Sequence, residues 1–149
     1  MISIKKTTSD NLDFNDLTRL FDDYLVIIDG EEKDFFAQYN QIYLEHVIVY
    51  YENKMALGCG AFKEYEPKVA EIKRMFVLPE QRGKGIAVAI LNELEDWAKA
   101  KGYHSCILET SIRLESAIAL YKKSGYEVIP NYGQYIGVES SVCMKKMIK

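Results

Sequence analysis

The segment Met75–Val88 reads Met-Phe-Val-Leu-Pro-Glu-Gln-Arg-Gly-Lys-Gly-Ile-Ala-Val and joins an apolar run to a long helical pattern. Pro79 lacks a backbone donor and favours an extended conformation at the preceding residue, so we expect a strand to end at Leu78. Gly83 and Gly85 permit a tight turn and a close approach of the backbone to a ligand. The sequence therefore predicts a strand, a glycine turn and a helix that begins at about Gly85.

This turn has the properties of a phosphate-binding site. The first N–H groups of a helix lack intrahelical acceptors and lie at the positive end of the helix dipole. Arg82 and Lys84 add mobile positive charge beside these groups. A compact strand–turn–helix connection without any ligand is the alternative interpretation.

Two common phosphate-binding motifs do not fit the turn. A P-loop requires Gly-Lys followed by Ser or Thr, whereas Lys84 is followed by Gly85. A dinucleotide-binding turn has a third glycine and opens a repeated βαβ series. Ala87 takes the third small position here, and no such series precedes it.

The pattern Arg-x-x-Gly-x-Ala at 82–87 resembles the pyrophosphate-binding signature of the GNAT superfamily, the acetyl-CoA-dependent N-acetyltransferases. The segment Ala70–Val77 is similar to the central strand of that family. The segment Ala117–Tyr126 resembles its second coenzyme-side motif, a helix that carries a tyrosine and ends at Gly-aromatic. The resemblance extends over about residues 70–128.

The resemblance implies how acetyl-CoA would be held. The turn would bind the pyrophosphate, mainly through main-chain N–H groups, and the pantetheine arm would pair with the backbone of Met75–Val77. One amide there, of Phe76 or Val77, would face the thioester oxygen. The next strand, His104–Glu109, would splay away and open the slot. The predicted cofactor-binding residues are Met75, Phe76, Val77, Arg82, Gly83, Lys84, Gly85, Ile86, Ala87, Val88 and Tyr121.

Alternating and helical patterns divide the rest of the chain into elements. The predicted strands are Ile2–Lys6, Val47–Glu52, Met55–Lys63, Lys68–Leu78, His104–Glu109, Tyr126–Ile129 and Ser141–Met147. The predicted helices are one from a cap at Asp13 to Asp29-Gly30, and then Glu32–Tyr43, Ile86–Lys101 and Leu114–Ser124. We therefore expect one GNAT-like α/β (α+β) domain over residues 1–149, with a mixed, mostly antiparallel sheet of about six to seven strands and about four flanking helices.

Several local features carry more specific expectations. Asn53-Lys54 predicts a hairpin turn, and Gly58 and Gly60 in the following strand indicate a bulge or a close backbone approach. Trp97 belongs to the apolar stripe of the main helix and is expected in the core. The segment Pro130–Tyr135 is predicted to be a loop with two exposed tyrosines.

Composition excludes several classes of function. The chain has 149 residues, a net charge of −3 and no basic block, which argues against nucleic-acid binding. Its apolar runs are too short to cross a bilayer, and its first residues lack the order of a signal peptide, so the cytoplasm is the expected location. Cys59, Cys106 and Cys143 are expected to be buried thiols. His46 and His104 stand alone, and we predict no metal site.

Tyr121 is the predicted proton donor to the departing thiolate. A thiol of pKa about 8.5 can take a proton from a positioned phenol of pKa about 10 once the charge on sulfur is desolvated. The position of Tyr121 in Ala-x-x-x-Tyr-x-x-x-Gly resembles that of the general-acid tyrosine of the family. The alternative is that its ring only packs between the helix and the cofactor.

The reaction also needs a general base, because an amine of pKa about 10.4 must lose a proton before it attacks. The sequence offers two candidates for this base. Glu71 resembles the position of a catalytic glutamate in some family members. Glu109 ends the next predicted strand and is a second candidate. An equally weighted alternative pairs such a carboxylate with Lys73 or Arg74.

The expected acceptor is a small-molecule amine, and its contacts are sought in the first two helices. The candidates are Tyr24, Asp29, Asp34 and Tyr39, each of which has a structural role as the alternative. Leu114 stands where many relatives have asparagine, which puts a polar contact to the cofactor in doubt. Lys122 and Lys123 could meet an outer phosphate or simply be solvated.

Three further hypotheses remain at this point. The chain could acetylate a protein N-terminus or lysine, it could bind acyl-CoA without catalysis, or it could bind ordinary nucleotides. A homodimer through the final strands and the Pro130–Tyr135 loop is a further hypothesis about partners.

Overall fold

The computed structural model describes residues 1–37 and 42–149, apart from the side chains of residues 31, 33 and 34. Within these residues, seven strands form one sheet in the order β1-β2-β3-β4-β5-β7-β6, which confirms the predicted mixed sheet. The strands are β1 (Ile2–Thr7), β2 (His46–Glu52), β3 (Met55–Glu66), β4 (Val69–Val77), β5 (Ser105–Ser111), β6 (Glu127–Ile129) and β7 (Ser141–Met147).

The helices of the described residues match the predicted set with two differences. They are α1 (Leu12–Asp29), α2 (Lys33–Ala37), α3 (Ile86–Ala100) and α4 (Glu115–Lys123), with 3-10 turns η1 (Gly30–Glu32), η2 (Pro79–Gln81) and η3 (Gly133–Tyr135). The cap of α1 is Asn11 and not Asp13, because the Asn11 side chain accepts a hydrogen bond from the N–H of Phe14. The second helix does not include Ile42 and Tyr43, and the predicted contact Tyr39 lies outside the described residues.

Contacts along the chain divide it into two compact units. Unit 1 comprises residues 1–63 and 73–94, and unit 2 comprises residues 64–72 and 95–149. Strand β4 and helix α3 therefore each contribute to both units.

The N-terminal strands of unit 1 are built on a tight hairpin. Strand β1 pairs with β2, and β2 pairs with β3, in both cases antiparallel. Asn53 and Lys54 both have positive φ angles, 51° and 71°, as the two central residues of a type I′ hairpin turn require. The predicted hairpin is thus confirmed, and a register shift lies between Tyr50 and Tyr51.

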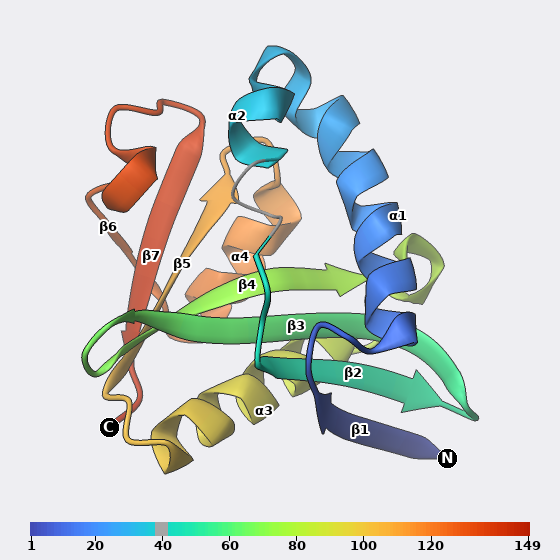
Figure 1. Ribbon diagram of the computed structural model, residues 1–149. Coiled ribbons are helices and arrows are strands. Elements are labelled where there is room, and N and C mark those ends of the chain that lie inside the picture. The colour runs from blue at the N-terminus through green and yellow to red at the C-terminus, as the bar shows by residue number, and fades with distance from the viewer. Residues whose placement is uncertain (38–41) are drawn as a thin grey trace. The chain divides into compact units, whose positions relative to one another are not determined.

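The core of unit 1 lies between α1 and the sheet (Figure 1). Phe14 and Leu17 on α1 pack with Val47 and Val49 on β2. On the other face, β3 and α3 approach closely, and a Cβ built on Gly60 would lie 2.9 Å from side-chain atoms of both Ile90 and Leu94 of α3. A side chain at Gly60 would therefore displace its neighbours, which is the close approach that the sequence predicted.

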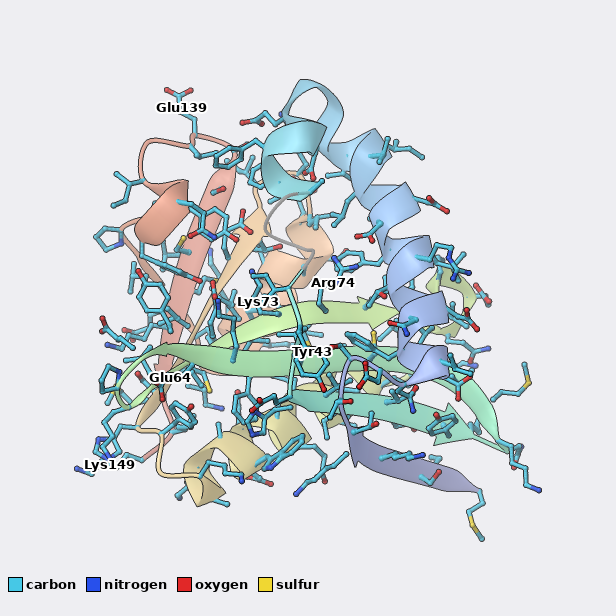
Figure 2. All side chains as sticks on the ribbon, in the orientation of Figure 1. Tyr43, Glu64, Lys73, Arg74, Glu139 and Lys149 are labelled. Atoms are coloured by element: carbon cyan, nitrogen blue, oxygen red, sulfur yellow. The ribbon has the colours of Figure 1, made fainter. Side chains whose placement is uncertain are left out.

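Arg74 is the most unusual residue of unit 1. It has a positive φ of 58°, it is 7% exposed, and its side chain projects from β4 on the side of α1 (Figure 2). Its Nη2 donates to the carbonyl oxygen of Thr18 (3.1 Å) and to Oδ1 of Asp22 (2.7 Å), and its guanidinium lies over the ring of Phe21. A charged side chain of β4 thus fastens α1 to the sheet.

Replacing Asp22 by Asn should therefore destabilise the protein. The buried guanidinium would lose its charged partner, and we expect a loss of about 1–3 kcal/mol in the free energy of unfolding, since the Asp22 side chain is itself 42% exposed. Asp16→Asn is the matched control, because Asp16 pairs with Arg19 at 3.4 Å on the exposed face of the same helix and should change stability by less than about 0.5 kcal/mol. Urea unfolding of both variants measures the difference, and equal effects would contradict the assignment.

Unit 2 is built around β5 and β7. Strand β4 runs parallel to β5, with Glu71 beside Ile107, and β5 pairs antiparallel with β7, with Glu109 beside Cys143. Paired residues, and residues two apart, point to the same face of a sheet. Glu71, Glu109 and Cys143 therefore share one face.

The opposite face of unit 2 carries a buried polar network. The hydroxyl of Tyr126 donates to Oε2 of Glu95 (2.8 Å), and Nζ of Lys146 lies 2.8 Å from Oε1 of the same carboxylate. Glu95 is 7% exposed, so both of its oxygens are satisfied by the protein. The Gly-aromatic end of α4 at Tyr126 is thus part of the packing of this unit.

The three cysteines are free and fully buried, as the sequence predicted. Burial raises the pKa of the Cys59 thiol from 9.0 to about 12, against the opposing charge of Arg74. Burial, followed by the negative charge of Glu95, raises the pKa of Cys106 to about 12. In the unfolded chain both thiols ionise near their ordinary pKa.

Stability should consequently fall at alkaline pH. Above about pH 9 the folded chain binds more protons than the unfolded chain. The contribution of these thiols to the free energy of unfolding is therefore fully present below that pH and is lost as pH rises towards 12. Between pH 7 and pH 10, each of these two thiols should account for a loss of about 1.4 kcal/mol. Urea unfolding at both pH values measures the loss. Cys59→Ala should lose about 1.4 kcal/mol less than wild type over this interval, and an unchanged loss would contradict the argument.

Candidate functional site

The glycine turn of unit 1 has the predicted arrangement. Strand β4 ends at Val77, Pro79 opens the 3-10 turn η2, and α3 begins at Ile86. Gly83 and Gly85 both have φ of 81°, a left-handed conformation that favours glycine. Strand, turn and helix thus follow one another as expected, and the helix begins at the predicted Ile86.

The backbone of this turn is open. A Cβ built on Gly83 or Gly85 meets no heavy atom within 4 Å among the described residues, and both glycines are exposed. The N–H of Ala89 donates to the carbonyl oxygen of Gly85 (3.0 Å), which is the first hydrogen bond of the helix. The N–H groups of residues 86–88 therefore have no acceptor within the helix. No side chain of the described residues fills this turn, and its free N–H groups fit a diphosphate.

The two cations of the turn each donate a hydrogen bond within the protein. Nε of Arg82 donates to the carbonyl oxygen of Val77 (3.0 Å), and its guanidinium lies 5.6 Å from the ring centre of Tyr24. Nζ of Lys84 donates to Oε1 of Gln81 (2.8 Å). Arg82 therefore supports the turn by tying it to the end of β4, and Tyr24 supports Arg82.

The predicted pantetheine-pairing segment follows an irregular point of β4. The left-handed conformation of Arg74 interrupts the regular strand immediately before Met75. Phe76 is 5% exposed and stacks on Phe21 of α1 at 5.1 Å, whereas Met75 lies against Gly60. Backbone conformations of this kind cost energy and concentrate at functional sites.

Tyr121 lies on α4 in unit 2. It is 7% exposed, and its ring meets that of Tyr126 edge-on at 5.8 Å. Burial, followed by the negative charge of Glu109, raises the pKa of Tyr121 well above its ordinary value. The phenol is therefore protonated at neutral pH and able to donate.

Glu71 is almost fully buried, at 3% exposure, and has a hydrogen-bond donor that the sequence did not indicate. The hydroxyl of Tyr132 donates to Oε2 of Glu71 at 2.6 Å. The alternative pairing of Glu71 with Arg74 is wrong, because the Arg74 guanidinium pairs with Asp22. Glu71 therefore stands beside a neutral donor and not in that ion pair.

Glu109, the second candidate base, lies on the same face of unit 2. Its Oε2 accepts a hydrogen bond from the hydroxyl of Ser141 (2.7 Å). The pKa of Tyr135 is raised by burial and then by the negative charges of Glu109 and Glu71. Both carboxylates thus act electrostatically on the same tyrosine.

The expectation of two exposed tyrosines in the Pro130–Tyr135 loop is wrong. Tyr135 is 4% exposed, and Tyr132 is half-buried with its hydroxyl on Glu71. Asn131 holds the segment in place, since its Nδ2 donates to the carbonyl oxygens of Tyr135 (3.1 Å) and Val138 (3.0 Å). Polar loop composition gave no indication that these rings face a carboxylate.

The remaining residues singled out in the sequence form no catalytic contact among the described residues. Asp29 is buried at the end of α1, and the side chain of Asp34 lies outside the described residues. Leu114 caps α4 without a side-chain hydrogen bond, and Lys122 and Lys123 are exposed. Trp97 is half-buried rather than fully in the core.

No group of three or more His, Cys, Asp or Glu side chains in residues 1–37 and 42–149 could hold a metal ion. None of the helices formed by these residues combines the length and the apolar character that a membrane-spanning helix needs.

Sequence comparison identifies relatives of this chain. The profile of the acetyltransferase (GNAT) family matches residues 14–126. The chain is 38% identical over 91 residues to an IAA acetyltransferase of Azospirillum brasilense, covering 60% of each protein. It is 31% identical over 105 residues to YjgM, an uncharacterized N-acetyltransferase of Escherichia coli K12, covering 69% of this chain and 63% of the relative. The matched region spans less than two thirds of the length of these relatives.

Solved structures resemble the whole chain. A Klebsiella pneumoniae protein provisionally described as an acyl-CoA N-acyltransferase has a TM-score of 0.85 at 26% identity, covering 100% of this chain and 99% of that one. The PaiA N-acetyltransferase of Thermoplasma acidophilum, solved in complex with coenzyme A, has a TM-score of 0.71 at 21% identity, with 99% of both chains covered.

Proposed function

This chain belongs to the acetyltransferase (GNAT) family, and on that premise we propose that it transfers the acetyl group of acetyl-CoA to a primary amine of a small molecule. The open glycine turn at Gly83 and Gly85 carries this proposal. Its exposed backbone offers unpaired N–H groups at the start of a helix, which is a favourable site for a diphosphate.

In this scheme, the glycine turn and the end of β4 hold the co-substrate. The N–H groups of residues 83–88 bind the diphosphate of acetyl-CoA, and Arg82 keeps the turn attached to β4 through Val77. The backbone of Met75–Val77 pairs with the pantetheine arm, and an amide of Phe76 or Val77 donates to the thioester oxygen as negative charge develops on it.

Tyr121 and one carboxylate supply the proton transfers of the scheme. The amine nitrogen attacks the thioester carbon, the carbon–sulfur bond breaks, and the thiolate takes the phenolic proton of Tyr121. The nitrogen loses its proton to Glu71 or Glu109, directly or through water. Tyr121 recovers a proton from solvent before the next turnover, and the products are an amide and coenzyme A.

The class of acceptor is proposed from two carboxylates of unit 2. Glu71 and Glu109 share one face, and carboxylates attract an ammonium group. A polyamine, an amino acid or an amino sugar has a suitable primary amine. A protein N-terminus or lysine is the second candidate acceptor, and non-catalytic binding of acyl-CoA is the alternative from another class.

The organisation and location of the enzyme are part of the proposal. We regard residues 1–149 as one catalytic domain, and the three free, buried thiols fit a reducing compartment such as the cytoplasm. A homodimer would use β6, at one end of the strand order, where Val128 is 58% exposed. Sedimentation at several protein concentrations tests for it.

The experiment that tests the function measures thiol release from acetyl-CoA. Spermidine, L-lysine, glucosamine and a lysine-containing peptide are each supplied as acceptor, with no acceptor as the blank. We expect release above the blank with at least one of the three small amines. Binding of acetyl-CoA without release on any acceptor would favour the non-catalytic alternative, and release with the peptide alone would favour a protein acceptor.

A further inference from the structure

Tyr132 belongs to unit 2, and the reaction scheme above gives it no role. Its hydroxyl donates to Oε2 of Glu71 at 2.6 Å, the length of a strong bond from a hydroxyl to a carboxylate. Glu71 is 3% exposed, so this bond replaces hydration at one of its two oxygens. The two residues are 61 positions apart in the sequence: Tyr132 immediately precedes η3, and Glu71 lies in the first half of β4.

The packing around Tyr132 fixes its ring independently of Glu71. Its ring meets the ring of Tyr65 edge-on at 5.0 Å and the ring of Tyr135 edge-on at 5.7 Å. The next residue, Gly133, has a φ of 53°, and a Cβ built there would lie 3.3 Å from the hydroxyl of Tyr65. The donor is therefore held in place before any substrate binds.

The environment also keeps Tyr132 a donor. Burial, followed by the negative charge of Glu71 and the hydrogen bond to it, raises the pKa of Tyr132 far above its ordinary value. Tyr135 and Cys143 lie close enough to act in the same direction. A phenol in these surroundings stays neutral at physiological pH and continues to donate to the carboxylate.

The other oxygen of Glu71 is differently placed. Among the described residues of the protein, no group donates to Oε1, whereas Oε2 is occupied by Tyr132. A hydrogen bond to one oxygen fixes the orientation of a carboxylate and leaves the other oxygen to accept a proton. The two oxygens of Glu71 thus have separate tasks.

We propose that Tyr132 is a positioning residue for the general base: its hydroxyl holds Oε2 of Glu71 so that Oε1 takes the proton from the acceptor amine. The inference rests on the proposed function and selects Glu71 over Glu109 as the base. Tyr132 acts through Glu71 and does not itself exchange a proton with the substrate.

The experiment is a double-mutant cycle on kinetics. The variants are Tyr132→Phe, Glu71→Gln and the combination of both, assayed by thiol release with the best amine among spermidine, L-lysine and glucosamine. We expect Tyr132→Phe to lower kcat about tenfold with little change in the KM for acetyl-CoA, and Glu71→Gln to lower kcat by at least about 100-fold. On the Glu71→Gln background, Tyr132→Phe should cause no further loss.

Tyr126→Phe is the matched control. It also removes a buried hydrogen bond from a tyrosine to a glutamate, 2.8 Å long, in the same unit but on the opposite face of the sheet. Its kcat should stay within about twofold of wild type, although both variants lose one bond of similar energy. All assays are run at a temperature at which circular dichroism shows each variant folded.

The outcomes separate the inference from the function on which it rests. Full activity of Tyr132→Phe, or an equal fold-loss with and without Glu71, would overturn the positioning role while leaving acetyl transfer intact. Full activity of Glu71→Gln would remove Glu71 as the base and the inference with it. Failure of wild type to release thiol with every amine would overturn the proposed function itself.

Discussion

Replacing Tyr121 by Phe should lower kcat by about 100-fold or more and leave the affinity for acetyl-CoA almost unchanged. The variant loses the proton that the departing thiolate takes, and general-acid catalysis typically accounts for about 10²–10⁴ in rate. The aromatic ring is retained, so its edge-on packing with Tyr126 and the shape of α4 are preserved. Steady-state kinetics with saturating amine, together with a direct binding titration of acetyl-CoA, measures both quantities.

The result distinguishes the catalytic role of Tyr121 from a packing role. If the ring only packs, Tyr121→Phe should keep the wild-type kcat, and Tyr121→Ala should lower stability and cofactor affinity together. Tyr135→Phe is a useful comparison because that phenol is also buried and has a raised pKa, yet it is not in the reaction scheme. An equal loss of kcat in both Phe variants would contradict a specific role for Tyr121.

Replacing Gly85 by Ala should raise the KM for acetyl-CoA about 10- to 100-fold. A Cβ at Gly85 would point into the open space beside the turn and keep the diphosphate from the backbone N–H groups. A tenfold loss corresponds to about 1.4 kcal/mol of binding free energy, which is well within the value of contacts to a charged group. The KM is measured from thiol release at a fixed amine concentration.

The control for this variant is Gly102→Ala. Gly102 ends α3 with a φ of 97°, and a Cβ built there also meets nothing within 4 Å among the described residues. Both alanines must adopt a left-handed conformation, which costs roughly 1–2 kcal/mol of stability in either case. Only Gly85→Ala should change the KM, and an equal change in both variants would show that lost stability is responsible.

The sequence predicted those parts of the fold that depend on local chemistry. Strand β7 has the predicted bounds, Ser141–Met147, and the hairpin at Asn53-Lys54 and the turn before α3 were identified from residues adjacent in sequence. Pro79, Gly83 and Gly85 determine the turn before α3 directly, and an asparagine at position 53 tolerates the left-handed conformation of the hairpin turn. The turn that carries the proposed function belongs to this group.

Contacts between distant positions were not predictable in the same way. Tyr132 and Glu71 are separated by 61 residues, and Arg74 and Asp22 by 52, and no periodicity links either pair. The sequence offers Arg74, alongside Lys73, only as an alternative partner for a candidate carboxylate. The left-handed conformation of Arg74 and its contact with α1 arise from tertiary packing, which overrides the local pattern.

The Pro130–Tyr135 loop shows the same limit for the site. Its proline, asparagine and glycine identify a loop, and loops usually lie at the surface. Asn131 nevertheless folds the segment onto itself and directs Tyr132 towards a carboxylate of another strand. The composition of this segment indicates that it is a loop, whereas the contacts of its tyrosines are evident only from the folded structure.

The central claim is that the open turn at Gly83 and Gly85 holds the diphosphate of acetyl-CoA. Isothermal titration calorimetry of the wild-type chain with acetyl-CoA, and in parallel with S-acetylpantetheine, tests it most directly, because the second compound keeps the thioester and lacks the diphosphate. The account predicts measurable heat and saturable binding for acetyl-CoA, with at least about 100-fold weaker binding of S-acetylpantetheine. No heat with acetyl-CoA, or equal affinity for the two compounds, would contradict it.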